Sequence, residues 1–260
     1  MIYNLKNNNM WIKVPEPMQT EVTTSWVYRN RSLWLISMKY YSEWFTMSDK
    51  NLWATQVYND WDEKTDSNCW KLFQRWNNNP FPWISTSDIN WIITISDTKV
   101  DTTWYWPWNY YNSNIWINGG TSSWQSSVNS NLWWWSESYD DYTKRQWPCP
   151  NWWHIPSQHE LGIFEDMTRL GFYNSSIYMD FVQKVLKIPY ANYRLYGWAM
   201  ITSTVKQARI RSSDNWHCTF SNNGANRWFK TVANSTWEPI RPFKNEPVIP
   251  TIYWEVLYQF

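Results

Sequence analysis

Glycine is scarce in this sequence. The chain has 6 glycines among 260 residues, whereas average usage would give about 18. Glycine adopts positive φ at turns without steric cost, so a chain with many short turns and few glycines is expected to be strained at its corners. Tryptophan is abundant instead, with 26 residues. This reversal of the usual proportions needs a physical explanation.

The balanced charge and the lack of long apolar runs limit the classes of partner and function that we expect. Lys and Arg number 23 against 22 Asp and Glu, so no basic surface is predicted and nucleic acid is not an expected partner. No apolar run reaches the length of a transmembrane segment, and residues 1–17 lack the charged and apolar regions of a signal peptide. The mean hydropathy of −0.66 and the many Asn, Ser and Thr residues favour a β-rich extracellular domain with long loops.

Residues that could bind a metal are few and poorly spaced. Cys149, His154 and His159 follow a C-x4-H-x4-H spacing that matches no compact structural zinc pattern. His217 and Cys218 lie far along the chain from this group. We therefore predict no metal and no cofactor.

Residues 145–160, RQWPCPNWWHIPSQHE, predict a rigid loop that leads into a helix. Three prolines exclude regular structure up to Ser157, which is placed to act as an N-cap with Glu160 as its capping-box partner. Apolar residues then recur at helical spacing up to Gly171, a typical C-cap residue. A second helix is predicted within residues 175–187. Alternating apolar residues at 33–38 and 44–47 predict the two strands of a hairpin.

The same stretch resembles the signature of the FISUMP family (Fibrobacter succinogenes major paralogous domain), written roughly RQGPCPxGWHVPS. Residues 49–59, DKNLWATQVYN, and 69–79, CWKLFQRWNNN, resemble further family motifs. The resemblance implies a C-type-lectin-like α+β fold, with two short helices packed on small antiparallel sheets with long loops. The implied structural-motif residues are Cys69, Pro148, Cys149, Pro150, His154, Pro156, Ser157, Glu160, Arg241 and Phe243.

The resemblance also implies a domain organisation. Residues 1–25 would be a tail or the end of a preceding unit, and residues 26–245 the FISUMP domain. Residues 246–260 resemble a linker that opens a possible next unit in tandem relatives.

Tryptophan stands at many positions where the family has glycine. We therefore hypothesise that UGA codons, which some uncultured candidate-phylum bacteria read as glycine, have been translated here as Trp. The positions indicated by the family's glycines are Trp53, Trp61, Trp70, Trp76, Trp106, Trp134, Trp135, Trp147, Trp152, Trp216 and Trp237. Trp147 and Trp152 are expected to have crowded or solvent-exposed indoles. The alternative is a genuinely Trp-rich protein, for instance one that binds carbohydrate.

The resemblance leaves two states open for the cysteines. In many relatives the cysteine of the PCP motif pairs with one near the C-terminal strand, but this chain has Pro242 at that place. Cys69 is then the candidate partner of Cys149, and Cys218 would be free. The alternative is three reduced, buried thiols.

The family implies a non-enzymatic, secreted or cell-surface module that binds a protein or glycan. Its expected ligand-binding residues lie in the polar stretch 205–235, which could equally be a solvated loop: Asn215, His217, Asn222, Asn223, Asn226 and Arg227. Glu238-Pro239 resembles an element of sugar-binding lectins, but we discount it because it falls in the strand that closes the fold.

Two other functions remain as alternatives. One is a structural repeat unit of a surface array, which residues 246–258 suggest. The other is a degenerate formylglycine-generating-type enzyme, which would need a reactive cysteine pair where this chain has Cys218 alone. No Ser-His-Asp order, phosphate-binding loop or paired-carboxylate motif is present, so an enzyme is not expected.

Overall fold

The structure is a computed structural model. It describes the following residues: 2–4, 11–13, 26–40, 43–59, 67, 71–74, 77–82, 94–101, 113, 115–117, 125–127, 145, 148–162, 179–190, 193–194, 200–201, 207–213, 216–221, 228–231 and 237–259. Predicted features in the gaps, including the first helix beyond Gly162, lie outside the described residues.

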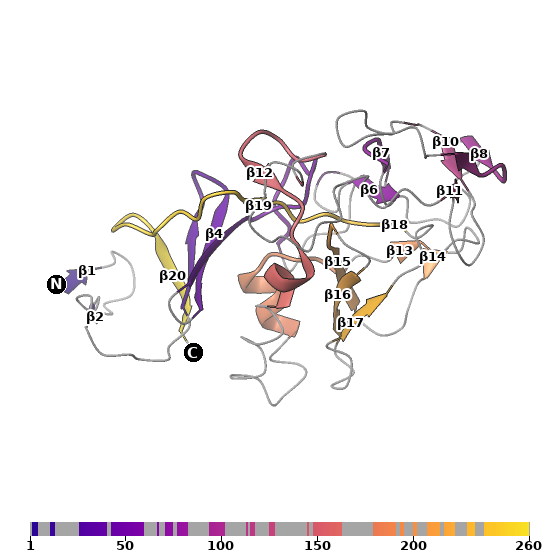
Figure 1. The fold of residues 1–260 in the computed structure, drawn as a ribbon. Coiled ribbons are helices and arrows are strands. Elements are labelled where there is room, and N and C mark those ends of the chain that lie inside the picture. The colour runs from indigo at the N-terminus through magenta and orange to yellow at the C-terminus, as the bar shows by residue number, and fades with distance from the viewer. Residues whose placement is uncertain are drawn as a thin grey trace.

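The largest sheet has six strands, all paired antiparallel (Figure 1). The predicted hairpin is confirmed, because β4 pairs with β5 along its whole length. In spatial order the strands are β12 (Trp153–His154), β19 (Phe243–Lys244), β5 (Glu43–Ser48), β4 (Leu35–Tyr40), β3 (Trp26–Asn30) and β20 (Glu255–Gln259).

The inner face of this sheet forms the main core. Alternation along the strands places Val27, Ile36, Met38 and Met47 on one face, where all four are fully buried. The segment that contains η2 (Phe181–Val185) belongs to the same cluster through its buried apolar side chains. The core therefore joins strands from the N-terminal third of the described chain to a helix from its C-terminal half.

Two smaller sheets complete most of the fold. The first has the order β14 (Met200–Ile201), β13 (Tyr193–Arg194), β18 (Trp237–Glu238), β6 (Lys71–Gln74) and β7 (Pro80–Pro82), and the second the order β15 (Gln207–Arg211), β16 (Trp216–Ser221) and β17 (Trp228–Thr231). Both are antiparallel.

Three two-stranded pairs contain the remaining strands of the described residues. β1 (Ile2–Asn4) pairs antiparallel with β2 (Trp11–Lys13). The two parallel pairs are β8 (Thr94–Ser96) with β10 (Ile115–Ile117), and β9 (Val100–Asp101) with β11 (Gln125–Ser127).

The described helical segments are short. Residues 158–162 are α-helical, and the second predicted helix appears as residues 179–180 followed by the π-helix η2. It ends before the predicted Lys187, because Leu186 N–H donates to the carbonyl of Phe181 and Lys187 takes a positive φ of 55°. Mostly antiparallel sheets with short helices confirm the α+β prediction at this coarse level. No helix among the described residues is long and apolar enough to cross a membrane.

Three tryptophans have a backbone conformation that favours glycine. Within the described residues, the non-glycine residues at positive φ are Trp34 (58°), Trp53 (66°), Trp152 (69°) and Lys187 (55°). Trp53 and Trp152 are predicted glycine positions, and the side chain of Trp152 is 71% exposed as expected. Trp34 was not predicted; it ends the turn between β3 and β4, where hairpin loops often need a left-handed residue.

Two of the other predicted glycine positions lie in strands and lack the positive φ found at Trp53 and Trp152. Trp216 begins β16 and Trp237 begins β18, and neither has a positive φ. A strand backbone does not require glycine there, so the conformation gives no support at these two positions. Trp61, Trp70, Trp76, Trp106, Trp134, Trp135 and Trp147 lie outside the described residues.

Candidate functional site

A buried hydrogen-bond network centres on Glu160 at the start of the first helix. Its Oε2 accepts hydrogen bonds from Nη1 of Arg145 (2.7 Å) and from the backbone N–H of Ser157 (2.8 Å). Its Oε1 accepts a bond from Nε2 of His154 (2.7 Å). Ser157 Oγ accepts the backbone N–H of Glu160 (3.1 Å), which completes the predicted capping box.

The charges of this network keep Glu160 ionised. Burial alone would raise the pKa of the carboxyl, but the hydrogen bond and charge of His154 and the charge of Arg145 lower it from 4.5 to about 2. Nδ1 of His154 lies 3.0 Å from Oδ1 of Asn245.

The network ties the proline loop to distant parts of the chain. Ile155 N–H donates to the carbonyl of Arg145, and Ser213 N–H donates to the carbonyl of Pro156. Pro148 and Pro156 are buried, whereas Pro150 is exposed. The prediction that no regular structure occurs before Ser157 is wrong at Trp153–His154, because these two residues form β12 and pair with β19.

Cys149 does not form the disulfide that was considered from the family resemblance. Its thiol is free and buried, and burial raises the thiol pKa well above its ordinary value. Of the two states left open, the reduced and buried thiol is the one found at Cys149, which packs in an apolar cluster with Leu52, Ile155 and Ile240 as a small apolar side chain. Cys69 lies outside the described residues, and Cys218 is buried in the main core.

Arg241 and Phe243 hold the closing segment in place. Arg241 is fully buried and donates to the carbonyls of Ser48 (3.0 Å) and Lys187 (2.6 Å). Burial lowers the pKa of its guanidinium to about 9; Asp49 partly offsets this, and Arg29 adds to it. Phe243 is buried and pairs with Met47 of β5.

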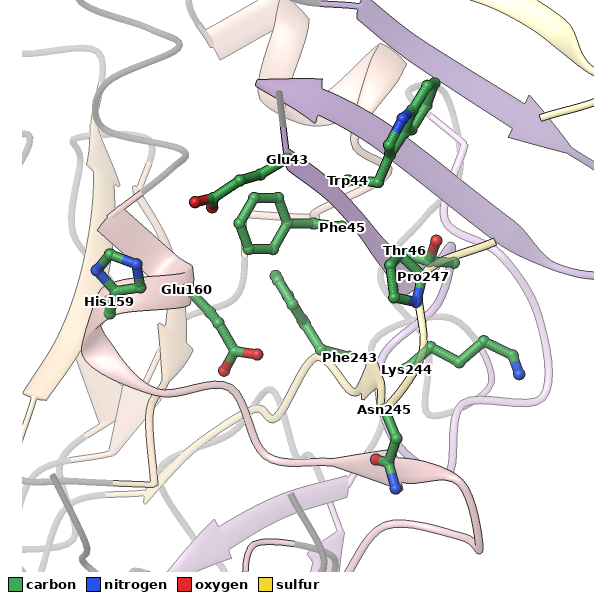
Figure 2. Close-up of a pocket in the computed structure, with 10 residues that line it drawn as sticks. All are labelled: Glu43, Trp44, Phe45, Thr46, His159, Glu160, Phe243, Lys244, Asn245 and Pro247. Atoms are coloured by element: carbon green, nitrogen blue, oxygen red, sulfur yellow. The ribbon is translucent and has the colours of Figure 1, made fainter. Parts of the chain in front are cut away.

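A pocket of about 360 Å³ opens beside the Glu160 network (Figure 2). Figure 2 shows the side chains of Glu43, Phe45, Phe243 and Glu160 around a common space, whereas Trp44 extends away from it. The lining residues come from β5, from the first helical turn and from the segment around β19: Glu43, Trp44, Phe45, Thr46, His159, Glu160, Phe243, Lys244, Asn245 and Pro247.

The pocket combines an apolar wall with a charged rim. Phe45 and Phe243 supply the apolar surface, and Phe45 also packs against the main core. Glu43 and His159 are exposed at the rim. Because both oxygens of Glu160 are occupied by internal donors, this carboxylate shapes the pocket electrostatically but is poorly placed to transfer a proton.

Of the ligand-binding residues predicted from the sequence, only His217 belongs to the described part of the chain, and it is not among the residues that line this pocket. Asn215, Asn222, Asn223, Asn226 and Arg227 lie outside the described residues, and only the backbone of His217 is described, in β16. His217 is four residues from Ser221, the end of that strand, which corresponds to about 13 Å. His217 therefore does not lie next to the end of β16 from which residues 222–227 continue.

The carboxylate of Glu238 is buried and lies close to the guanidinium groups of two arginines. Glu238 is fully buried in β18, with carboxylate oxygens 3.5 Å from Nη1 of Arg209 and 3.2 Å from Nη2 of Arg211. Because Glu238 and Pro239 are both buried, they offer no surface to a sugar. Among the described residues, no group of three or more His, Cys, Asp or Glu is placed to hold a metal ion.

Sequence reasoning missed most of the pocket. Glu160 and Phe243 were predicted as structural residues, but nothing local indicated that β5 would meet them. The sequence does indicate the orientation of Phe45. Phe45 and Met47 are two residues apart on one strand, so both face the core side of the sheet.

Comparisons with protein-family models, with curated proteins and with solved structures find no match for this chain.

Proposed function

We propose that this chain is a non-enzymatic ligand-binding module, of FISUMP type on a C-type-lectin-like scaffold, that acts outside the cell or at its surface. The ligand is a protein or a glycan. The observation that best supports binding is the pocket next to the Glu160 network, because it offers an apolar wall and a charged rim on a scaffold held by buried ion pairs.

The chemistry of the pocket favours recognition over catalysis. A general acid or base needs a pKa near the working pH and a free oxygen or nitrogen directed at the substrate. Glu160 has a pKa of about 2 and its carboxylate oxygens accept bonds from Arg145, His154 and Ser157. Cys149 is buried with a raised pKa, which makes its thiolate scarce.

The rigidity of the site supports the same proposal. Arg145, His154 and Glu160 are all nearly or fully buried, and their bonds join the proline loop, the helix start and Asn245 after β19. A preformed site loses little conformational entropy when a ligand binds.

The test is a binding screen of the biotinylated chain against an array of glycans and an array of peptides. For a ligand found in this way, Glu43→Gln and Phe45→Leu are each expected to raise Kd about tenfold, a loss of about 1.4 kcal/mol. Lys184→Gln, an exposed lysine in η2, is the matched control and should leave Kd unchanged.

A second set of variants separates the two candidate sites. Replacing Asn222, Asn223, Asn226 and Arg227 together with alanine tests the site predicted from the sequence. Loss of binding in this variant alone would keep the binding function and move its site away from the pocket. A chain that binds nothing on either array contradicts the proposal.

A further inference from the structure

The final strand of the large sheet pairs with the first strand of the same sheet. β20 occupies the edge beside β3, with Glu255 opposite Arg29 and Gln259 opposite Trp26. Residues 245–254 connect β19 to this strand. In Figure 1 this connector passes over the end of the sheet that carries the β3–β4 turn before it continues as β20.

The described contacts that hold β20 are mostly backbone hydrogen bonds. The pairing with β3 is irregular between Val256 and Tyr258, and the side chains of Glu255 and Val256 are exposed. One exposed ion pair, Arg31 Nε to Glu255 Oε2 at 3.1 Å, adds to the pairing. An identical strand from another copy of the chain would supply the same bonds.

The connector is held at its start, where Asn245 N–H donates to the carbonyl of Trp152, and at its end, where Trp254 is buried. A third contact lies between them, at Val248. Val248 N–H donates to Thr46 Oγ1 (2.7 Å), and its carbonyl accepts a bond from Ser37 Oγ (2.8 Å). Beyond this anchor, Ile249, Ile252 and Tyr253 are 64%, 68% and 83% exposed.

Exposed apolar side chains gather at this end of the sheet. Apart from tryptophans and Ile115, the large apolar residues that are exposed in the described chain all lie in the connector, in β20 or in the adjoining turn: Leu33, Ile249, Ile252, Tyr253 and Val256. The Arg31–Glu255 pair holds that turn beside the start of β20. A clustered apolar surface of this kind is typical of an interaction site.

We propose that β20 exchanges between two copies of this chain, so that β20 of one copy pairs with β3 of the other. The connectors of the two copies then run side by side and cover Ile249, Ile252 and Tyr253. The exchange replaces each strand contact with an identical one and adds apolar burial between the connectors.

The register specifies a second copy as the partner. A foreign strand would have to reproduce the irregular step between Val256 and Tyr258 and place a carboxylate beside Arg31, whereas β20 of another copy has both. Residues 249–254, at about 3.3 Å per residue, reach about 20 Å when extended, enough to cross to a neighbouring sheet edge. Val248 can remain on its own sheet.

The decisive experiment uses two full-length single variants, Tyr28→Cys and Val256→Cys, whose positions are opposite each other in the β3–β20 pair. The two chains are mixed at high concentration, allowed to equilibrate and oxidised. Strand exchange predicts a disulfide between position 28 of one copy and position 256 of another, identified by peptide mass. A mixture of Lys39→Cys and Trp44→Cys, opposite each other in the β4–β5 hairpin, is the matched control and should give none.

Light scattering over a range of concentrations gives the second measurement. The wild-type chain is expected to form dimers as concentration rises, and Ile252→Ser with Tyr253→Ser should weaken this association about tenfold or more. A chain that stays monomeric, or dimers that never link positions 28 and 256, would overturn the proposal.

Discussion

His154 Nε2 donates a hydrogen bond of 2.7 Å to Oε1 of Glu160. This bond joins the proline loop to the helix that follows it. Arg145 forms an ion pair with the other oxygen, Oε2, of the same carboxylate. Removing the anion would leave the guanidinium of Arg145 buried without a counter-charge. Breaking a buried ion pair in this way usually costs more than its formation contributes.

Glu160→Gln is therefore expected to lower the free energy of unfolding by about 3–5 kcal/mol. Urea denaturation followed by fluorescence measures the change. Asp180→Asn is the matched control, because its pair with Lys184 is an exposed i,i+4 contact and should be worth at most about 0.5 kcal/mol. A loss below about 1 kcal/mol for the Glu160 variant would show that the network does not stabilise the fold.

The pH dependence of stability follows from the same carboxyl group. Its pKa is about 2 in the folded chain and near 4.5 when unfolded, so the unfolded state binds more protons between these values. The stabilisation is fully present above about pH 4.5 and is lost as the pH falls toward 2. At about 1.4 kcal/mol per pH unit this amounts to about 3 kcal/mol. Urea unfolding at several pH values should show this loss in the wild type and lack it in Glu160→Gln.

Asp49→Asn is expected to destabilise the fold strongly, by about 3–5 kcal/mol. Asp49 is fully buried, accepts a 2.9 Å bond from Arg29 and offsets the buried charge of Arg241. Glu255→Gln removes the carboxylate of an exposed arginine pair and should change stability by less than about 1 kcal/mol. Equal losses for the two variants would contradict the role given to burial.

Replacing Trp34, Trp53 or Trp152 with glycine should stabilise the chain by about 1 kcal/mol each. A left-handed conformation costs a non-glycine residue about 1–2 kcal/mol, and glycine removes this cost. The net stabilisation is smaller, because glycine also increases the conformational entropy of the unfolded chain. Trp44→Gly in β5 is the control and should destabilise, since Trp44 is half-buried and packs against Tyr28. Thermal unfolding of the four variants measures the difference in sign.

The origin of these tryptophans can be tested directly in the organism. The mass of the tryptic peptide 146–169 from the native source is expected to show glycine at positions 147 and 152. Tryptophan at both positions would contradict the UGA hypothesis and would make the exposed indoles candidates for glycan binding.

The thiol of Cys149 should react slowly with an aromatic disulfide reagent in the folded chain and quickly in denaturant, because burial raises its pKa. Peptide mapping after alkylation identifies the site. Recovery of an unreduced peptide that links positions 69 and 149 would be the contrary result.

Sequence reasoning succeeded where the determining contacts were local. The capping box of Ser157 and Glu160 and the β4–β5 hairpin each depend on residues close in sequence, whose spacing sets the geometry. The pairing of β20 with β3 and the meeting of Phe45 with Phe243 depend on segments about 200 residues apart, and no local pattern encodes them. Trp34 was missed because the family motifs do not extend over that turn.

The pairing of Gln259 with Trp26 also has a mechanical consequence. Chain that precedes β3 and chain that follows β20 would leave the sheet at the same end of an antiparallel pair. A pulling force applied through both would load one hydrogen bond at a time and peel the strands apart, whereas a shearing load would be shared by the whole ladder. Under tension this edge would therefore open at low force, and the rest of the sheet would remain closed.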